Sequence, residues 1–189
     1  PSGRDGESID NGAFRNTPGP RLTDMKLASY KDGSRDGQLL VVSRDLATAH
    51  YATGIATRTQ HLLDDWNFLS PQLHDLYQAL NQGRTRHAFA FDPKQCMAPL
   101  PRAFQWADGS AFINHVELVR KARSAEVPES FYHDPLMYQG GSDGFLPPRG
   151  SIRLGDVKWG WDMEGEIAVM VDDVPMGVSS EEAAEHIKL

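Results

Sequence analysis

The chain has 189 residues, of which 40% are hydrophobic, and this is enough apolar material for one large domain or two small ones. Its net charge of -7, with no basic run, argues against nucleic acid as the main partner. No apolar stretch approaches the length of a membrane span, so we expect no membrane association. The single cysteine, Cys96, excludes an intrachain disulfide framework and fits a reducing compartment, which favours a cytoplasmic location.

Residues 1–24 are poor in apolar side chains and rich in Gly, Pro, Asp, Asn and Arg. This composition predicts a disordered leader or a non-native extension, with Met25 as the native start. The segment has neither the apolar core of a signal peptide nor the Arg-rich, acid-poor character of a transit peptide.

The next part of the chain alternates short apolar runs with turn signals. Residues 25–30 have strand character, the Gly- and Asp-rich stretch 31–37 predicts a turn, and residues 38–43 predict a second strand. After Arg44-Asp45 the chain turns toward a further extended segment, 47–53. The pattern indicates the start of a small mixed β/α domain.

Helical periodicity then replaces the strand pattern. Residues 58–66 predict a short helix, and a clearer helix is expected to begin at Ser70-Pro71 and to stop at Gly83. Its apolar stripe has the spacing i, i+3, i+4, i+7 and consists of Leu73, Leu76, Tyr77 and Leu80. Residues 86–91 and 94–100 read as strand-like segments, and the prolines at 99 and 101 indicate a domain junction.

A carboxylate and an imidazole follow this junction. Asp108-Gly109-Ser110 predicts a turn entering a helix, capped by Asp108 or Ser110, with His115 roughly two turns into the helix. Such a pair can serve as a metal ligand and a general base. The alternative is an N-cap aspartate and a partly exposed helical histidine, which the spacing alone favours.

Cationic and irregular segments come next. Arg120, Lys121 and Arg123 cluster at the C-terminal end of the expected helix, where cations suit the helix dipole, although one of them could bind a substrate carboxylate. Residues 125–151 are dominated by Pro, Gly, Ser, Asp and Tyr with little periodicity. A long irregular segment of this kind is usually functional or disordered.

Two glutamates open an apolar run near the end of the chain. Residues 164–171 predict a strand on which Glu164 and Glu166 share one face, while Ile167, Val169 and Val171 point into a core. Adjacent carboxylates repel unless a cation or many donors neutralise them, and paired oxygen ligands suit Mg²⁺ or Ca²⁺. The alternative is a solvated polar face on an edge strand.

Taken together, the Asp-Met-Glu-x-Glu run and the Asp108/His115 pair resemble the fumarylacetoacetate hydrolase family. The resemblance covers roughly residues 100–189 and, more loosely, 25–100. It implies that Mg²⁺ or Ca²⁺ is bound by three carboxylates and that His115 is catalytic; the three ligands are Asp108, Glu164 and Glu166. It also implies that Tyr138 contacts substrate. The family's carboxylate-binding Arg aligns nearest to Ser124, so Arg123 is a candidate for that role.

The resemblance implies an α+β fold: a small mixed β/α N-terminal domain over residues 25–104, then the first part of a β-rich, β-roll catalytic domain over 105–189. The family's later metal-binding Asp, with its Arg, Lys and Glu, cannot be assigned in this chain. The sequence is therefore similar to the front half of a hydrolase.

The implied activity is metal-dependent cleavage of a carbon–carbon bond in a small 1,3-dicarbonyl acid of the fumarylacetoacetate or acylpyruvate type, in the breakdown of aromatic compounds. The family resemblance also implies a homodimer for the full-length form. Decarboxylases and isomerases of 2-oxo acids share the same metal cage and stay open as alternatives. A further alternative is that this chain alone is an inactive fragment or a module that binds a partner chain.

Overall fold

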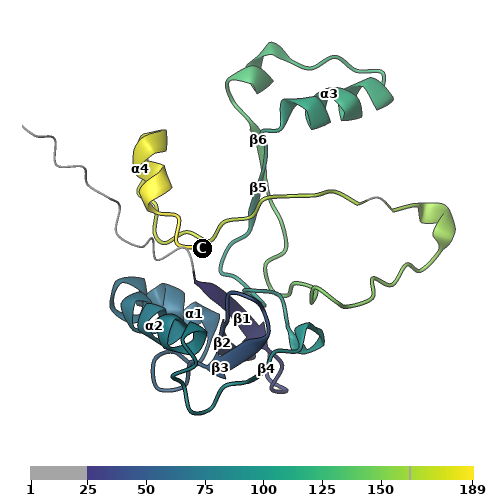
Figure 1. The fold of residues 1–189 in the computed structure, drawn as a ribbon. Helices are drawn as coiled ribbons and strands as arrows, with labels where there is room; N and C mark the ends of the chain where they lie inside the picture. The colour runs from purple at the N-terminus through teal and green to yellow at the C-terminus, as the bar shows by residue number, and fades with distance from the viewer. Residues whose placement is uncertain (1–24, 162) are drawn as a thin grey trace, which may run out of the picture.

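The computed structural model describes residues 25–161 and 163–189, so the leader expected over residues 1–24 lies outside the described residues. The first part is an antiparallel sheet with strand order β1-β2-β3-β4 (Figure 1). Its strands are β1 (Lys26–Tyr30), β2 (Gln38–Val42), β3 (Thr48–Tyr51) and β4 (Phe89–Ala90). The strands expected on either side of the 31–37 turn are thus confirmed, and they pair from Lys26–Val42 to Tyr30–Gln38.

Alternation along β2 divides the core between the two faces of the sheet. Leu39 and Val41 join the cluster beneath the helices, whereas Leu40 and Val42 pack with Tyr30 on the opposite face. These four side chains are all buried, since successive side chains of a strand point to opposite faces and both faces are covered. This makes β2 the central element of the N-terminal unit.

The helices α1 (Thr59–Asp64) and α2 (Trp66–Asn81) cover one face of the sheet. The expected start of the second helix at Ser70 was wrong: α2 begins at Trp66 and carries Pro71 inside it. Trp66 and Leu69 extend the apolar stripe toward the N-terminus and are buried in the same core, which favours helix despite the proline. Gly83, with φ of +66°, follows the helix end as expected.

Residues 94–100 do not form the expected strand. Pro93–Gln95 make a single 3₁₀ turn, η2, and Cys96 forms only an isolated bridge to Tyr30. Prolines at 93 and 99 have no N–H to donate to a ladder, which explains why pairing does not extend along this segment. The expected strand over residues 86–91 is reduced to the two residues of β4.

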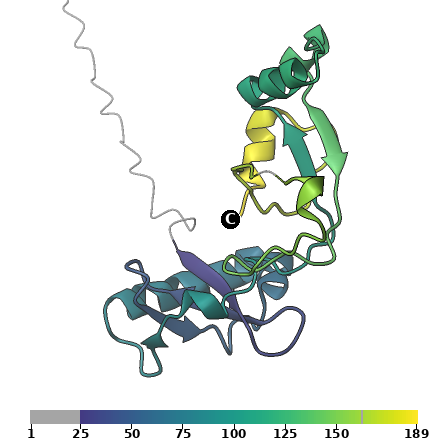
Figure 2. The same cartoon turned by 90° about the vertical axis from the view of Figure 1, so that its right-hand side faces the viewer.

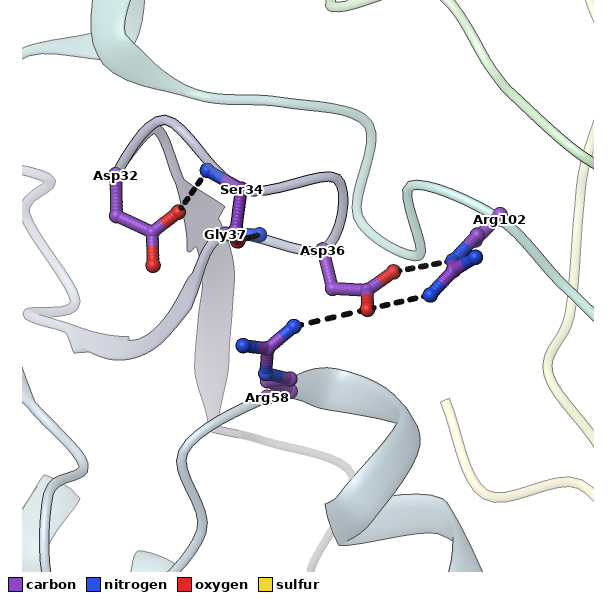
Figure 3. A network of polar contacts seen from close by, with 6 residues as sticks. All are labelled: Asp32, Ser34, Asp36, Gly37, Arg58 and Arg102. Carbon is purple, nitrogen blue, oxygen red and sulfur yellow. Dashed lines mark hydrogen bonds and ion pairs between the residues drawn. The ribbon is translucent and has the colours of Figure 1, made fainter.

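A charged network holds the β1–β2 turn to the end of the N-terminal unit (Figure 3). Asp36 accepts two hydrogen bonds from Arg102, at 2.6 and 2.9 Å, and one from Arg58 at 2.9 Å. These contacts hold the pKa of Asp36 below its usual range, with the Arg102 bonds as the largest cause. Arg102 lies in the stretch that leads to the second part of the chain, so the network ties that stretch to the sheet.

The second part is built around a two-stranded antiparallel sheet, β5 (Ala107–Ser110) with β6 (Leu136–Gln139). The helix α3 (Ile113–Ala122) and the 3₁₀ turn η3 (Glu129–Tyr132) lie at the end of this sheet that points away from the N-terminal unit (Figures 1 and 2). The remaining elements are η4 (Val157–Trp159) and α4 (Ser180–Glu185). The mixed α+β class is confirmed.

The turn and helix expected around residues 108–115 are not formed as predicted. Asp108 is on β5, not in a turn that caps a helix, because its strand pairs with β6, and α3 begins only at Ile113. His115 therefore lies in the first turn of α3, not two turns in. The segment 125–151, which the sequence predicts to be irregular, contains four residues that form the strand β6.

The strand expected over residues 164–171 is not formed either. Only Val171 makes a bridge, with Ile187, while Met170 exchanges backbone hydrogen bonds with Lys188 and Leu189. Ile167 is 95% exposed where a core position was expected. Across the described residues, no neighbouring strand offers this segment a ladder, and an unpaired extended segment gains nothing from its alternating pattern.

Two smaller features complete the fold. Ser179 and Glu182 form a reciprocal capping box at the start of α4. Leu189 packs against the helix-covered core of the N-terminal unit, which brings the last described residues back to that unit. In the parts of the chain that the structure describes, no helix has the length and apolar character needed to cross a membrane.

Candidate active site

Asp108 and Tyr138 lie directly opposite each other in the β5–β6 register. The Tyr138 hydroxyl donates a hydrogen bond to Asp108 Oδ2 over 3.2 Å. Partial desolvation raises the pKa of Tyr138, and so do the hydrogen bond to Asp108 and that residue's charge. The phenol therefore stays protonated, and its hydroxyl remains available as a hydrogen-bond donor beside Asp108.

His115 and Glu164 form the second contact of the site. His115 Nε2 is 3.4 Å from Glu164 Oε1, although the two residues are 49 positions apart in the sequence. The start of α3 at Ile113 places the imidazole on the first helical turn, close to the segment that carries the glutamates. A carboxylate at this distance can orient an imidazole.

Glu164 and Glu166 are also linked to the Asp108–Tyr138 pair. The negative charges of both glutamates act on the Tyr138 phenol and raise its pKa further. The charges of three carboxylates from two distant segments thus act on one phenol. Contacts join four of the predicted residues in two pairs, Asp108 with Tyr138 and His115 with Glu164, while Glu166 is connected to them through its charge on Tyr138.

Comparison with known families matches both parts of the chain. Residues 25–102 match the description "Fumarylacetoacetase N-terminal domain 2", and residues 105–189 match "Fumarylacetoacetate (FAA) hydrolase C-terminal". The chain belongs to the fumarylacetoacetate hydrolase family. A comparison with curated proteins found no match. The second match contains every residue of the acidic site of this hydrolase-family chain.

The donor types at this site suit a hard divalent cation, because carboxylate oxygens are the ligands that Mg²⁺ and Ca²⁺ prefer. Within residues 25–161 and 163–189, however, no group of three or more His, Cys, Asp or Glu side chains converges closely enough to hold a metal ion. The structure instead forms two pairs, Asp108 with Tyr138 and His115 with Glu164. The carboxylate oxygens are thus suitable ligands for a divalent cation, but among the described residues they do not converge on one point.

Arg123, the candidate for binding a substrate carboxylate, is the C-cap residue of α3. It lies at the opposite end of that helix from His115. Its backbone N–H bonds the carbonyls of Val119 and Arg120, and Ser124 follows with a positive φ of 53°. The neighbouring Arg120 lies over the Phe131 ring at 5.0 Å. No contact in the described residues links Arg123 to the acidic site.

One aromatic residue beside the site was not singled out from the sequence. The Trp106 ring meets the Tyr138 ring edge-on, with centroids 5.7 Å apart and planes at 68°. Trp106, Met137 and Tyr138 line a cavity of about 220 Å³ together with Gln105, Ala107 and Gln139. The signal for Trp106 is its position two residues before Asp108, which places both on one face once β5 is recognised as a strand.

Proposed function

We propose that this family member is a metal-dependent hydrolase that cleaves a carbon–carbon bond in a 1,3-dicarbonyl acid of the fumarylacetoacetate or acylpyruvate type. The observation that carries the proposal is the approach of His115 Nε2 to Glu164 Oε1, at 3.4 Å. It supplies a general base beside a group of oxygen ligands. The family match supports hydrolase chemistry in general.

In the proposed site, three carboxylates would bind the cation and His115 would transfer the proton. Asp108, Glu164 and Glu166 would hold Mg²⁺ or Ca²⁺, which supplies positive charge to polarise a substrate carbonyl. His115, with Nε2 directed at Glu164, takes a proton from water at its other ring nitrogen, Nδ1, and the Glu164 carboxylate stabilises the imidazolium that forms.

The water oxygen then bonds to the distal carbonyl carbon, and the adjacent carbon–carbon bond breaks. Its electron pair leaves as an enolate, which takes up a proton to give the second product. Tyr138, whose hydroxyl already donates to Asp108, would turn this donor toward a substrate oxygen. A donor aimed at oxygen that gains negative charge favours the transition state over the ground state.

The proposal is tested by substituting the general base and the metal ligands one at a time. His115→Ala should lower the turnover of acetylpyruvate by about 10²-fold or more, the range for losing a general base, and should leave Mg²⁺ affinity nearly intact. Glu164→Gln and Glu166→Gln should weaken Mg²⁺ binding, because the carboxamide keeps the shape and loses the charge. Glu126→Gln, an exposed carboxylate outside the site, is the matched control.

These variants should be made in whichever form of the protein shows metal-dependent cleavage, the 189-residue chain or a longer natural one. If His115→Ala abolished Mg²⁺ binding, the assignment of His115 as base would be wrong. Loss of carbon dioxide from a 2-oxo acid, without hydrolysis of acetylpyruvate, would instead favour the decarboxylase chemistry of the family.

We further propose that the 189-residue chain alone does not hydrolyse acylpyruvates. The described residues form no three-ligand cluster, whereas Mg²⁺ and Ca²⁺ take about six or more oxygen ligands. Weak binding of the divalent cation is expected in calorimetry, and metal-dependent cleavage of acetylpyruvate by the purified chain would overturn this expectation.

A further inference from the structure

Trp106 extends the sheet of the site by one residue. The Gly140 N–H donates to the Trp106 carbonyl over 3.1 Å, directly beyond the paired residues Ala107 and Gln139. Side chains two apart on a strand share a face, so Trp106 and Asp108 face the same way as Tyr138. The indole, the phenol and the carboxylate therefore form a row along one side of the sheet.

Gly140 leaves the space in which the indole lies. A Cβ atom at position 140 would be 2.3 Å from Trp106 Cε3 and 2.4 Å from Cζ3, closer than real Cβ contacts come. The backbone of Gly140 is not in the left-handed region, so conformation alone does not require glycine here. The requirement at position 140 is for space, and the indole fills that space.

The indole in turn limits the position of Tyr138. The edge-on contact, at 5.7 Å and 68°, is one of the favoured arrangements of two aromatic rings. The side chain of Tyr138 is 53% exposed, so a contact on one side of the ring restricts a residue that is otherwise largely open to solvent. At the other end of the ring, the hydroxyl reaches Asp108.

We propose that Trp106 is a positioning residue, which holds the Tyr138 phenol against Asp108 and is itself seated by Gly140. Through Tyr138 it sets where the donor to a substrate oxygen lies, and this part of the inference rests on the proposed function. Trp106 and Tyr138 both line the cavity of about 220 Å³.

The first test is structural and needs no substrate. In nuclear magnetic resonance spectra of the 189-residue chain, Tyr138 should show the α–β couplings of one side-chain rotamer and a ring contact to the Asp108 β-protons. Trp106→Ala should average the couplings and remove that contact, whereas Trp106→Phe should largely retain both. Gly140→Ala should act like Trp106→Ala because it displaces the indole. Trp159→Ala, which removes an exposed indole elsewhere, is the control.

The second test asks whether Trp106 acts through Tyr138. Oxalate binding in the presence of Mg²⁺ is measured by calorimetry, with oxalate as the probe for a dicarbonyl acid. Trp106→Ala should weaken binding by roughly three- to tenfold, the usual range for one aromatic pair. In a Tyr138→Phe background the same substitution should have almost no further effect, since the donor that Trp106 positions is already gone.

The outcomes separate the two proposals. If Trp106→Ala leaves the Tyr138 couplings and its contact to Asp108 unchanged, or weakens oxalate binding equally in both backgrounds, the positioning role is overturned. If the unsubstituted chain, and any longer form of the protein, fails to bind oxalate with Mg²⁺, the proposed function is overturned, and the couplings still decide the role of Trp106.

Discussion

Replacing Leu73 by alanine should destabilise the N-terminal unit strongly. Leu73 is fully buried in α2 and packs in the cluster that contains Leu39 and Val41 of β2. Removing three carbon atoms from such a site costs the lost transfer free energy, about 0.8 kcal/mol for each, plus the free energy of the cavity that remains. Measured leucine-to-alanine changes in cores cost about 2–5 kcal/mol. For a chain of this size, that predicts a fall in melting temperature of about 4–20 °C.

The assay is thermal unfolding followed by circular dichroism at a helical wavelength. Phe68→Ala is the matched control, because Phe68 is in the same helix and 67% exposed, and its removal should shift the melting temperature by much less. A fall below about 4 °C for Leu73→Ala, the shift that corresponds to roughly 1 kcal/mol, would mean that α2 does not pack on β2 as described. Equal shifts for the two variants would contradict the same packing.

Two further predictions concern charge and capping. Asp36→Asn should lower the urea midpoint at pH 7 and have little effect in strong acid. Since Arg102 and Arg58 lower the folded-state pKa of Asp36, its contribution is present above the unfolded pKa of about 3.9 and is lost as pH falls through the folded pKa. Added salt should reduce the difference at pH 7. Ser179→Ala should remove the bond that its hydroxyl accepts from the Glu182 N–H over 3.2 Å, and faster hydrogen exchange of that amide is the measurement.

The N-terminal unit was largely predictable because its elements satisfy both local pattern and burial. Leu73, Tyr77 and Leu80 have helical spacing and are buried on one face of α2, as expected. Proline suits the first turn of a helix, so Pro71 predicts a start at Ser70, whereas α2 begins at Trp66. The burial of Trp66 outweighs that local rule, and only the packed structure shows it.

The second part was less predictable because its elements depend on distant partners. Asp108-Gly109-Ser110 has strong turn propensity, yet these residues pair with 136–138, and nothing near them in the sequence shows this. Residues 164–171 show the opposite case, in which the local pattern predicts a strand that the structure does not form. Their alternation is typical of a strand, but a strand gains its stability from cross-strand neighbours, which this segment has only at Met170 and Val171 among the described residues.

The candidate site combines both kinds of dependence. The identity of its residues came from the order of Asp108, His115 and the two glutamates along the chain, while their contacts depend on how β5, α3 and the 164–166 segment approach one another. The close pair of His115 and Glu164 lies between exposed side chains, at 45% and 58%, and carries little free energy by itself. Three neighbouring carboxylates repel one another, so the acidic side chains have no electrostatic reason to converge without a cation. Under the proposed function, a bound cation would draw Glu164 and Glu166 toward Asp108, and the Asp108–Tyr138 and His115–Glu164 pairs are the arrangement from which that site would close.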